Sequence, residues 1–125
     1  MMRPAARRDV AADAGSVWRI LTDLDRWPDW GPSVRSASTA DGGPLAAGSR
    51  GTVTTVGGLR LPFVIDELTP GRSWSWTVAG VRATDHRVNP TVDGCRVTLA
   101  VPLFAAPYLV ICRIAVRRIE ELATQ

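Results

Sequence analysis

In two segments between residues 50 and 104, hydrophobic and polar positions alternate with a period of two, which is typical of strands in a sheet with one dry and one wet face. In the segment 73–78, tryptophan and valine alternate with serine and threonine. In the segment 95–101, apolar residues alternate with arginine, threonine and alanine. Turn signals rich in glycine, proline and aspartate separate these segments. The pattern predicts strands over 50–56, 59–68, 72–79, 81–88 and 95–104.

Two other stretches have the periodicity of helices. Asp13 is a predicted N-cap for a helix with apolar positions at 17, 20, 21 and 24, and Pro28 predicts an end of that helix near Trp27. A second helix is predicted over 106–123, with Pro107 in its first turn. Its apolar face is formed by Tyr108, Ile111, Cys112, Ala115, Ile119 and Leu122.

The order of these elements predicts an α+β fold. A short strand over 3–11 comes first, then one or two short helices, a run of about six strands, and the long terminal helix. One helix covers roughly 10 Å of a sheet, whereas six or seven strands at about 4.8 Å spacing are roughly three times as wide. The sheet must therefore curl around the terminal helix. The gap between them is either filled by large side chains or left as an apolar ligand cavity.

Length and charge narrow the class of protein. The 125 residues predict a single domain over residues 1–125. The net charge is +3, and all 15 basic residues are arginines. They are scattered along the chain, whereas a nucleic-acid interface needs a basic stripe with interleaved aromatic residues. We therefore expect no nucleic-acid partner.

The two cysteines and the apolar stretches of the sequence indicate whether the chain binds a metal, spans a membrane or enters an oxidising compartment. Cys95 and Cys112 lack the spacing of a zinc site, and their expected positions lie too far apart for a disulfide. Free thiols are typical of a reducing compartment. The segment 1–14 lacks the apolar core of a signal peptide, and prolines interrupt the apolar stretch 97–112. The sequence predicts a cytoplasmic protein without a membrane span, metal or cofactor.

Four segments in this order resemble the START-like superfamily, also called SRPBCC. They are VAADAGSVW at 10–18, LTDLDRWPDW at 21–30, IDELTPGRSWSW at 65–76 and DGCRVT at 93–98. The superfamily includes polyketide cyclases and dehydrases as well as lipid-transfer domains. The resemblance implies a helix-grip fold, in which a curved antiparallel sheet of six to seven strands wraps a long C-terminal helix. It also implies a cavity between the sheet and that helix, but no particular reaction.

The first functional hypothesis is binding or carriage of a hydrophobic small molecule, either a lipid or a polyketide-like compound. Burial of the apolar ligand surface would supply most of the binding free energy. The expected lining combines inward strand positions with the inner face of the terminal helix. The ligand-binding candidates are Trp30, Phe63, Ile65, Trp74, Trp76, His86, Val88, Val97, Leu99, Val101, Tyr108, Cys112 and Ala115.

The alternative hypothesis is a polyketide cyclase or aromatase that acts by general acid/base chemistry. Such an enzyme needs a base beside a bound poly-ketone, and His86 and Asp66 are the weak catalytic candidates. Asp66 and Glu67 are neighbours on one strand, so they are expected to face opposite ways. The sequence leaves open how these side chains and His86 are oriented. An interaction module and a homodimer are further open alternatives.

Overall fold

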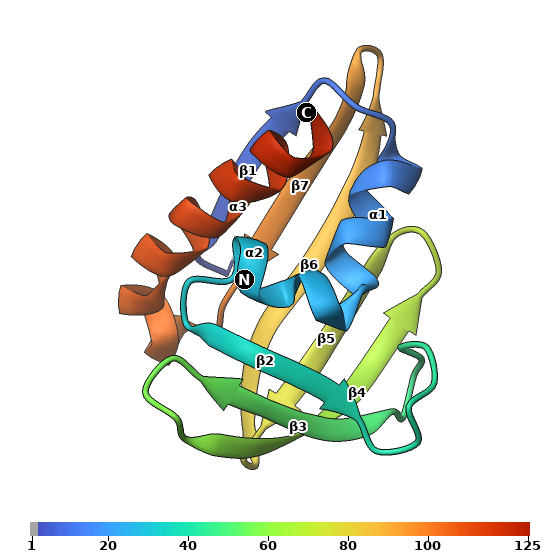
Figure 1. Ribbon diagram of the computed structural model, residues 1–125. Helices are drawn as coiled ribbons and strands as arrows, with labels where there is room; N and C mark the ends of the chain where they lie inside the picture. Colours follow the sequence, from blue (N-terminus) through green and yellow to red (C-terminus); the bar gives the residue numbers. More distant parts are fainter. Residues whose placement is uncertain (1–2) are drawn as a thin grey trace.

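Seven antiparallel strands form one curved sheet in the computed structural model, which describes residues 3–125 (Figure 1). The order across the sheet is β1-β7-β6-β5-β4-β3-β2, so consecutive strands are neighbours except for β1, which pairs with β7. The strands are β1 (Ala5–Val10), β2 (Val34–Thr39), β3 (Arg50–Thr55), β4 (Arg60–Thr69), β5 (Ser73–Val78), β6 (Val81–Thr91) and β7 (Gly94–Ala100).

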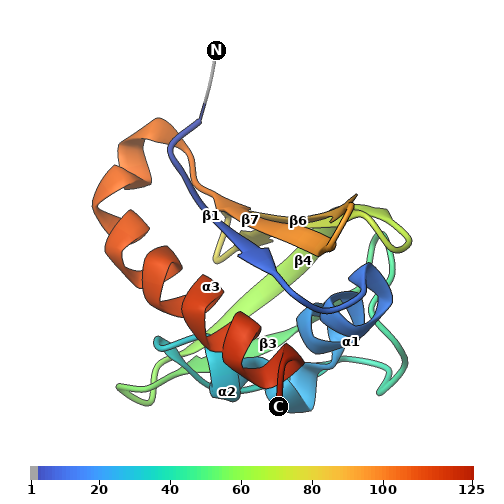
Figure 2. The ribbon, with the colours of Figure 1, turned by 90° about the horizontal axis from the view of Figure 1, so that it is seen from above.

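Two α-helices and a 3₁₀ turn follow β1, and a second helical pair ends the chain. The elements are α1 (Ala14–Thr22), η1 (Leu24–Arg26), α2 (Trp27–Trp30), η2 (Leu103–Tyr108) and α3 (Leu109–Ala123). All of them lie on the same face of the sheet, and Figure 2 shows α3 along the open side of the curled sheet. The predicted α+β helix-grip fold is therefore confirmed.

The predicted N-cap of α1 is confirmed in detail. The Asp13 carboxylate accepts hydrogen bonds from the Ser16 backbone amide at 3.0 Å and from the Ser16 hydroxyl at 2.7 Å. These bonds satisfy donors that the first helical turn leaves free. The cap places Val17 and Leu21 on the buried face of the helix.

Two predicted boundaries near the C-terminus are wrong. We expected a strand to 104 and a helix from 106, but β7 ends at Ala100 and α3 begins at Leu109. Pro102 has no N–H to donate to a strand neighbour, and the chain continues from it into the 3₁₀ helix η2, which contains Pro107. The predicted strand 81–88 is too short, because β6 continues to Thr91 while it pairs with β7 up to the turn at Gly94.

The curl is concentrated in the half of the sheet that contains β2 to β6. Register shifts interrupt the β2–β3, β4–β5 and β5–β6 ladders, whereas the β3–β4, β1–β7 and β6–β7 ladders are regular. Such bulges bend a strand and increase its twist. Gly51 allows a close approach within this half of the sheet. A Cβ at this position would lie 2.5 Å from the ring of Phe63, which occupies that space. The sheet thus closes over its own interior.

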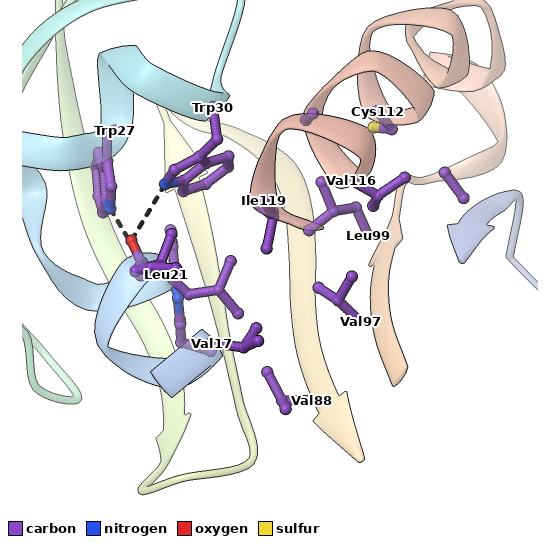
Figure 3. Close-up of a cluster of buried hydrophobic side chains, with 14 of the residues drawn as sticks. Val17, Leu21, Trp27, Trp30, Val88, Val97, Leu99, Cys112, Val116 and Ile119 are labelled. Atoms are coloured by element: carbon purple, nitrogen blue, oxygen red, sulfur yellow. Dashed lines mark hydrogen bonds between the residues drawn. The ribbon is translucent and has the colours of Figure 1, made fainter. Parts of the chain in front are cut away.

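The centre of the core lies where α3 crosses β1 and β7. Cys112 and Ala115 are small, so the helix approaches the sheet closely, and Val116 and Ile119 extend the contact toward α1 (Figure 3). Both cysteines are buried and free, in agreement with the expectation that they form no disulfide. Other buried side chains of this layer include Ala6, Val10, Val17, Leu21, Val88, Val97 and Leu99.

Candidate functional site

Two adjacent hollows lie between the curled sheet and the C-terminal helical segment. The inner pocket has a volume of about 40 Å³ and the outer pocket about 370 Å³. A cavity needs a volume of roughly 10–15 Å³ on this measure to hold one water molecule, so the inner pocket accepts only a small chemical group. The border between the pockets is shared by Ser33, Val34, Trp76, Thr84 and Tyr108.

The outer pocket is predominantly apolar. Its walls come from the start of β2, from β3 to β6 and from the segment that follows β7. Apart from the border residues, only Thr55 and Arg82 bring polar side chains to it. This composition suits an apolar ligand with few polar groups. The apolar lining consists of Val34, Val53, Leu61, Trp76, Val78, Val81, Ala83, Val101, Pro102, Phe104 and Ala105.

An aromatic cluster fills most of the space around the inner pocket. The rings of Trp27 and Trp74 stack with centroids 5.2 Å apart, and Trp76 meets both of them edge to face. The indole N–H of Trp27 donates to the Leu21 carbonyl at 3.0 Å, and that of Trp30 donates to the Ile20 carbonyl at 3.1 Å. The cluster is therefore tied to α1, and large side chains close the deepest part of the gap.

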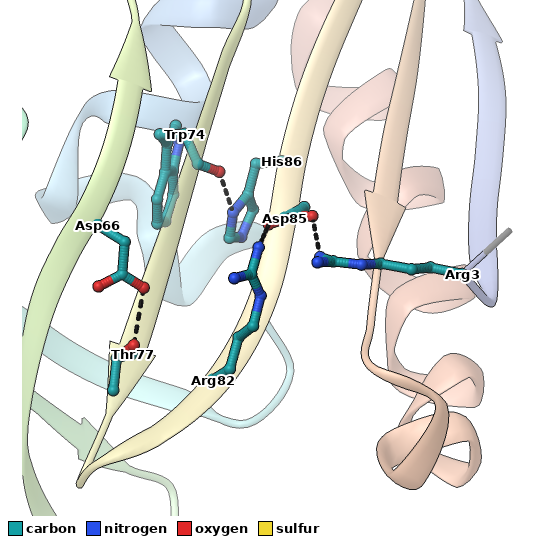
Figure 4. A network of polar contacts seen from close by, with 7 residues as sticks. All are labelled: Arg3, Asp66, Trp74, Thr77, Arg82, Asp85 and His86. Atoms are coloured by element: carbon teal, nitrogen blue, oxygen red, sulfur yellow. Dashed lines mark hydrogen bonds and ion pairs between the residues drawn. The ribbon is translucent and has the colours of Figure 1, made fainter. Parts of the chain in front are cut away.

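His86 lies within this cluster and faces the interior. Its ring stacks on Trp74 with centroids 3.6 Å apart, and its Nδ1 lies 3.3 Å from the Trp74 carbonyl (Figure 4). Burial lowers the pKa of His86 from 6.5 to about 3, although the hydrogen bond to the carbonyl acts in the opposite direction. The ring is therefore neutral near pH 7. Because a carbonyl only accepts, Nδ1 carries the proton and Nε2 is left with a free lone pair.

Asp66 lies outside both pockets. It is exposed, and its carboxylate accepts a hydrogen bond from the Thr77 hydroxyl at 2.7 Å (Figure 4). Asp66 is the extra residue at the register shift between Ile65 and Glu67. The expectation that Asp66 and Glu67 face opposite ways is therefore wrong: the bulge breaks the alternation, and both side chains are exposed.

The structure divides the remaining sequence-derived candidates into two groups. Those that line a pocket are Trp30, Trp74, Trp76, His86, Leu99, Val101, Tyr108, Cys112 and Ala115. Four others, Phe63, Ile65, Val88 and Val97, line neither pocket and lie in the packed core.

Sequence reasoning missed the parts of the outer pocket that come from β3, β4, the starts of β2 and β6, and the first residues of η2. Val78 has the same alternation as Trp74 and Trp76, so that signal was present. Val53 and Leu61 carry no comparable signal, because only the curl of the sheet brings them near β6. Phe104 was assigned to a strand, and its place at the pocket depends on the turn η2.

A hydrogen bond closes the border between the two pockets. The hydroxyl oxygens of Ser33 and Tyr108 lie 2.6 Å apart and connect the loop after α2 to the end of η2. Burial raises the pKa of Tyr108, and its hydrogen bond to Ser33 lowers that pKa in part. The phenol is therefore protonated near pH 7, and either hydroxyl can be the donor in this hydrogen bond.

We expect Tyr108→Phe to lower the free energy of unfolding by about 1 kcal/mol, the usual contribution of one such hydrogen bond. Urea denaturation measures this change. Ser33→Ala provides the matched variant, and the double variant is expected to lose no more than either single variant. Fully additive losses would show that the two hydroxyls do not interact.

The described residues hold no group of three or more His, Cys, Asp or Glu side chains that could bind a metal ion. Among residues 3–125, no helix is both long and apolar enough to span a bilayer. The Cys112 thiol lines the inner pocket, and burial raises its pKa to about 11. It is therefore a protonated, weakly polar part of the wall.

A curved antiparallel sheet around a long terminal helix, with hollows between the two, defines a helix-grip protein. The chain belongs to the family described as polyketide cyclase / dehydrase and lipid transport, whose model matches residues 1–122. A search of curated proteins gave no significant match.

Solved structures show the same fold at low sequence identity. NE0264 from Nitrosomonas europaea is 20% identical with a TM-score of 0.71, over 97% of this chain and 93% of that protein. The Aha1 dimer from Colwellia psychrerythraea is 14% identical with a TM-score of 0.73, over 98% and 96%. DynU16, described as coming from the dynemicin biosynthetic locus, is 16% identical with a TM-score of 0.68, over 97% and 46%. At these identities the likeness concerns the fold.

Proposed function

We propose that this protein binds a hydrophobic small molecule, a lipid or a polyketide-like compound, in the outer pocket and carries it. The observation that carries the proposal is a hollow of about 370 Å³ with almost entirely apolar walls. Pockets for small ligands have volumes of roughly 300–1,000 Å³ and few polar groups. Family membership supports the same ligand class. So does DynU16, a fold neighbour from a biosynthetic locus.

Desolvation supplies the affinity in this proposal. Burial of about 300 Å² of apolar ligand surface at about 25 cal/mol per Å² yields roughly 7 kcal/mol before the costs of association. The expected affinity is therefore micromolar at best, unless polar groups add to it. A ligand hydroxyl that reached the inner pocket would find the free Nε2 lone pair of His86 as an acceptor.

Binding explains the site better than the cyclase alternative. His86 is the candidate base that lines a pocket, and its pKa of about 3 makes it a poor proton acceptor at neutral pH. The other candidate, Asp66, is exposed to solvent outside both pockets. The free, buried Cys95 and Cys112 thiols support a reducing, cytoplasmic setting as part of the proposal.

Ala83→Phe tests the proposal by placing a ring in the outer pocket. The probe is 1-anilinonaphthalene-8-sulfonate, followed by energy transfer from the five tryptophans. We expect at least about tenfold weaker binding, because the added ring takes up apolar volume that the ligand would fill.

Ala100→Phe is the matched control, since Ala100 lies on the opposite face of the sheet beside Arg3 and Asp85. It is expected to bind the dye like the natural chain. Circular dichroism verifies that both variants fold. Equal dye binding by the natural chain and Ala83→Phe would mean that the outer pocket is not the binding site.

A further inference from the structure

Exposed large hydrophobic side chains are concentrated around the mouth of the outer pocket. Among the described residues, seven of the eight belong to three segments that border this pocket. We call these seven the mouth rim. The eighth, Val92, lies in the β6–β7 turn at the opposite end of the molecule (Figure 1). The mouth rim consists of Val56, Leu59, Val81, Leu103, Phe104, Tyr108 and Val110.

The three segments come together because of the fold. Val56 and Leu59 lie in the β3–β4 turn, between the pocket residues Thr55 and Leu61. Val81 lines the pocket from the start of β6, and Phe104 lines it from η2. Phe104 is 70% exposed although it is a pocket residue, so it stands at the edge of the opening.

The same segments carry positive charge without negative charge. Residues 54–62, 78–83 and 102–113 contain Arg60, Arg82 and Arg113 and neither aspartate nor glutamate. All three arginines are exposed. Arg82 forms only a loose ion pair with Asp85, at 3.8 Å.

This combination favours one kind of partner. An apolar patch rimmed by polar residues marks an interaction surface. In a dimer formed through the mouth rims of two copies, arginines of one copy would face arginines of the other, and this like-charge repulsion is unfavourable. A surface of anionic lipids offers acyl chains to the leucine, valine and phenylalanine side chains and phosphates to the guanidinium groups.

We propose that the mouth rim docks on an anionic lipid surface, with the opening of the outer pocket facing the lipid. An apolar ligand then passes between the bilayer and the pocket without crossing water. The docking surface consists of side chains at the edge of the pocket, so the proposal goes beyond ligand binding itself. The proposed docking applies equally to the protein without a bound ligand.

Co-sedimentation of the ligand-free full chain with vesicles tests the proposal. Vesicles of phosphatidylcholine that contain phosphatidylserine are compared with vesicles of phosphatidylcholine alone. Each arginine near an anionic surface strengthens binding roughly fivefold, so we expect at least about tenfold stronger binding to the anionic vesicles, reduced by added salt. Equal binding to both vesicle types, or none to either, overturns the proposal.

Paired variants locate the surface. Phe104→Ser combined with Leu103→Ser is expected to weaken binding to anionic vesicles at least about tenfold, because both side chains would otherwise enter the lipid. Val92→Ser removes an even more exposed hydrophobic side chain at the far end and is expected to have no effect. An equal loss in Val92→Ser would show that general surface hydrophobicity, and not the mouth rim, is responsible.

A second pair tests the charge. Arg113→Gln is expected to weaken binding roughly fivefold. Arg72→Gln removes an exposed arginine from the β4–β5 turn and is the matched control. An equal loss in both would mean that net charge alone directs binding, and binding to an acidic protein but not to vesicles would equally contradict the proposal.

The outcomes separate this proposal from the ligand-binding proposal. Ala83→Phe is expected to lose the dye and keep vesicle binding, whereas the Leu103/Phe104 double variant is expected to lose vesicle binding. Dye binding that persists without vesicle binding would remove the docking surface and leave the pocket proposal in place.

Discussion

Trp27→Ala is expected to lower the free energy of unfolding by about 3–5 kcal/mol, the usual cost of removing a buried indole. Trp27 is 1% exposed and touches the rings of Phe63, Trp74 and Trp76. Its N–H is also the donor to the Leu21 carbonyl, which joins α2 to α1. Domains of this size are stable by roughly 5–15 kcal/mol, so the loss is a large share of the total. Urea denaturation followed by circular dichroism measures it.

Trp18→Ala is the matched control for Trp27. It removes the same side chain from α1, where Trp18 is only partly buried, and is therefore expected to cost much less. Trp27→Phe covers the case in which Trp27→Ala does not fold, because phenylalanine keeps a ring in the cluster and deletes the hydrogen bond. Equal losses in Trp18→Ala and Trp27→Ala would show that the aromatic cluster does not dominate the stability of the core.

Lowering the pH from 7 to 5 is expected to reduce the free energy of unfolding by about 2 kcal/mol through His86 alone. The folded pKa of this histidine is about 3, below its ordinary value of 6.5. Between these two values the unfolded chain binds a proton that the folded chain does not, so stability falls as the pH falls. His86 is the one histidine in the sequence, so no second histidine contributes to the pH dependence of stability between pH 7 and 5.

His86→Phe is expected to abolish most of this pH dependence while keeping a ring against Trp74. The double variant His86→Phe with Arg87→His restores the histidine count at an exposed position, where a proton binds equally in the folded and unfolded chain. It should resemble His86→Phe. The pKa values of Asp9 and Asp13 are lowered by their hydrogen bonds to Arg96 and Ser16, so their contributions are lost at lower pH than this window. A pH dependence that survives in His86→Phe would contradict a buried neutral histidine.

The predictions for Trp27 and His86 concern the same wall of the site. Trp27, Trp74 and His86 close the deep end of the gap and leave only about 40 Å³ beside them. Both alternatives derived from the sequence are thus realised in part: large side chains fill the inner end, and the outer end stays open. The filled end provides stability, and the open end provides the proposed binding volume.

The sequence by itself determined the order of the elements, because strand and helix periodicities are local properties. The inward direction of Trp74, Trp76 and Leu99 follows from the same alternation. The capping of α1 by Asp13 is equally local and was readable from the residues alone.

The tertiary structure alone decided what the interior looks like. The bulge at Asp66 broke the alternation, so that Asp66 and Glu67 are both exposed, and no pattern in the residues announces a shift of register. The walls from β3, β4 and η2 reach the pocket only because the sheet curls and the chain turns after β7. Bulges, curvature and packing depend on contacts between segments far apart in the chain, which a period of two or 3.6 residues does not encode.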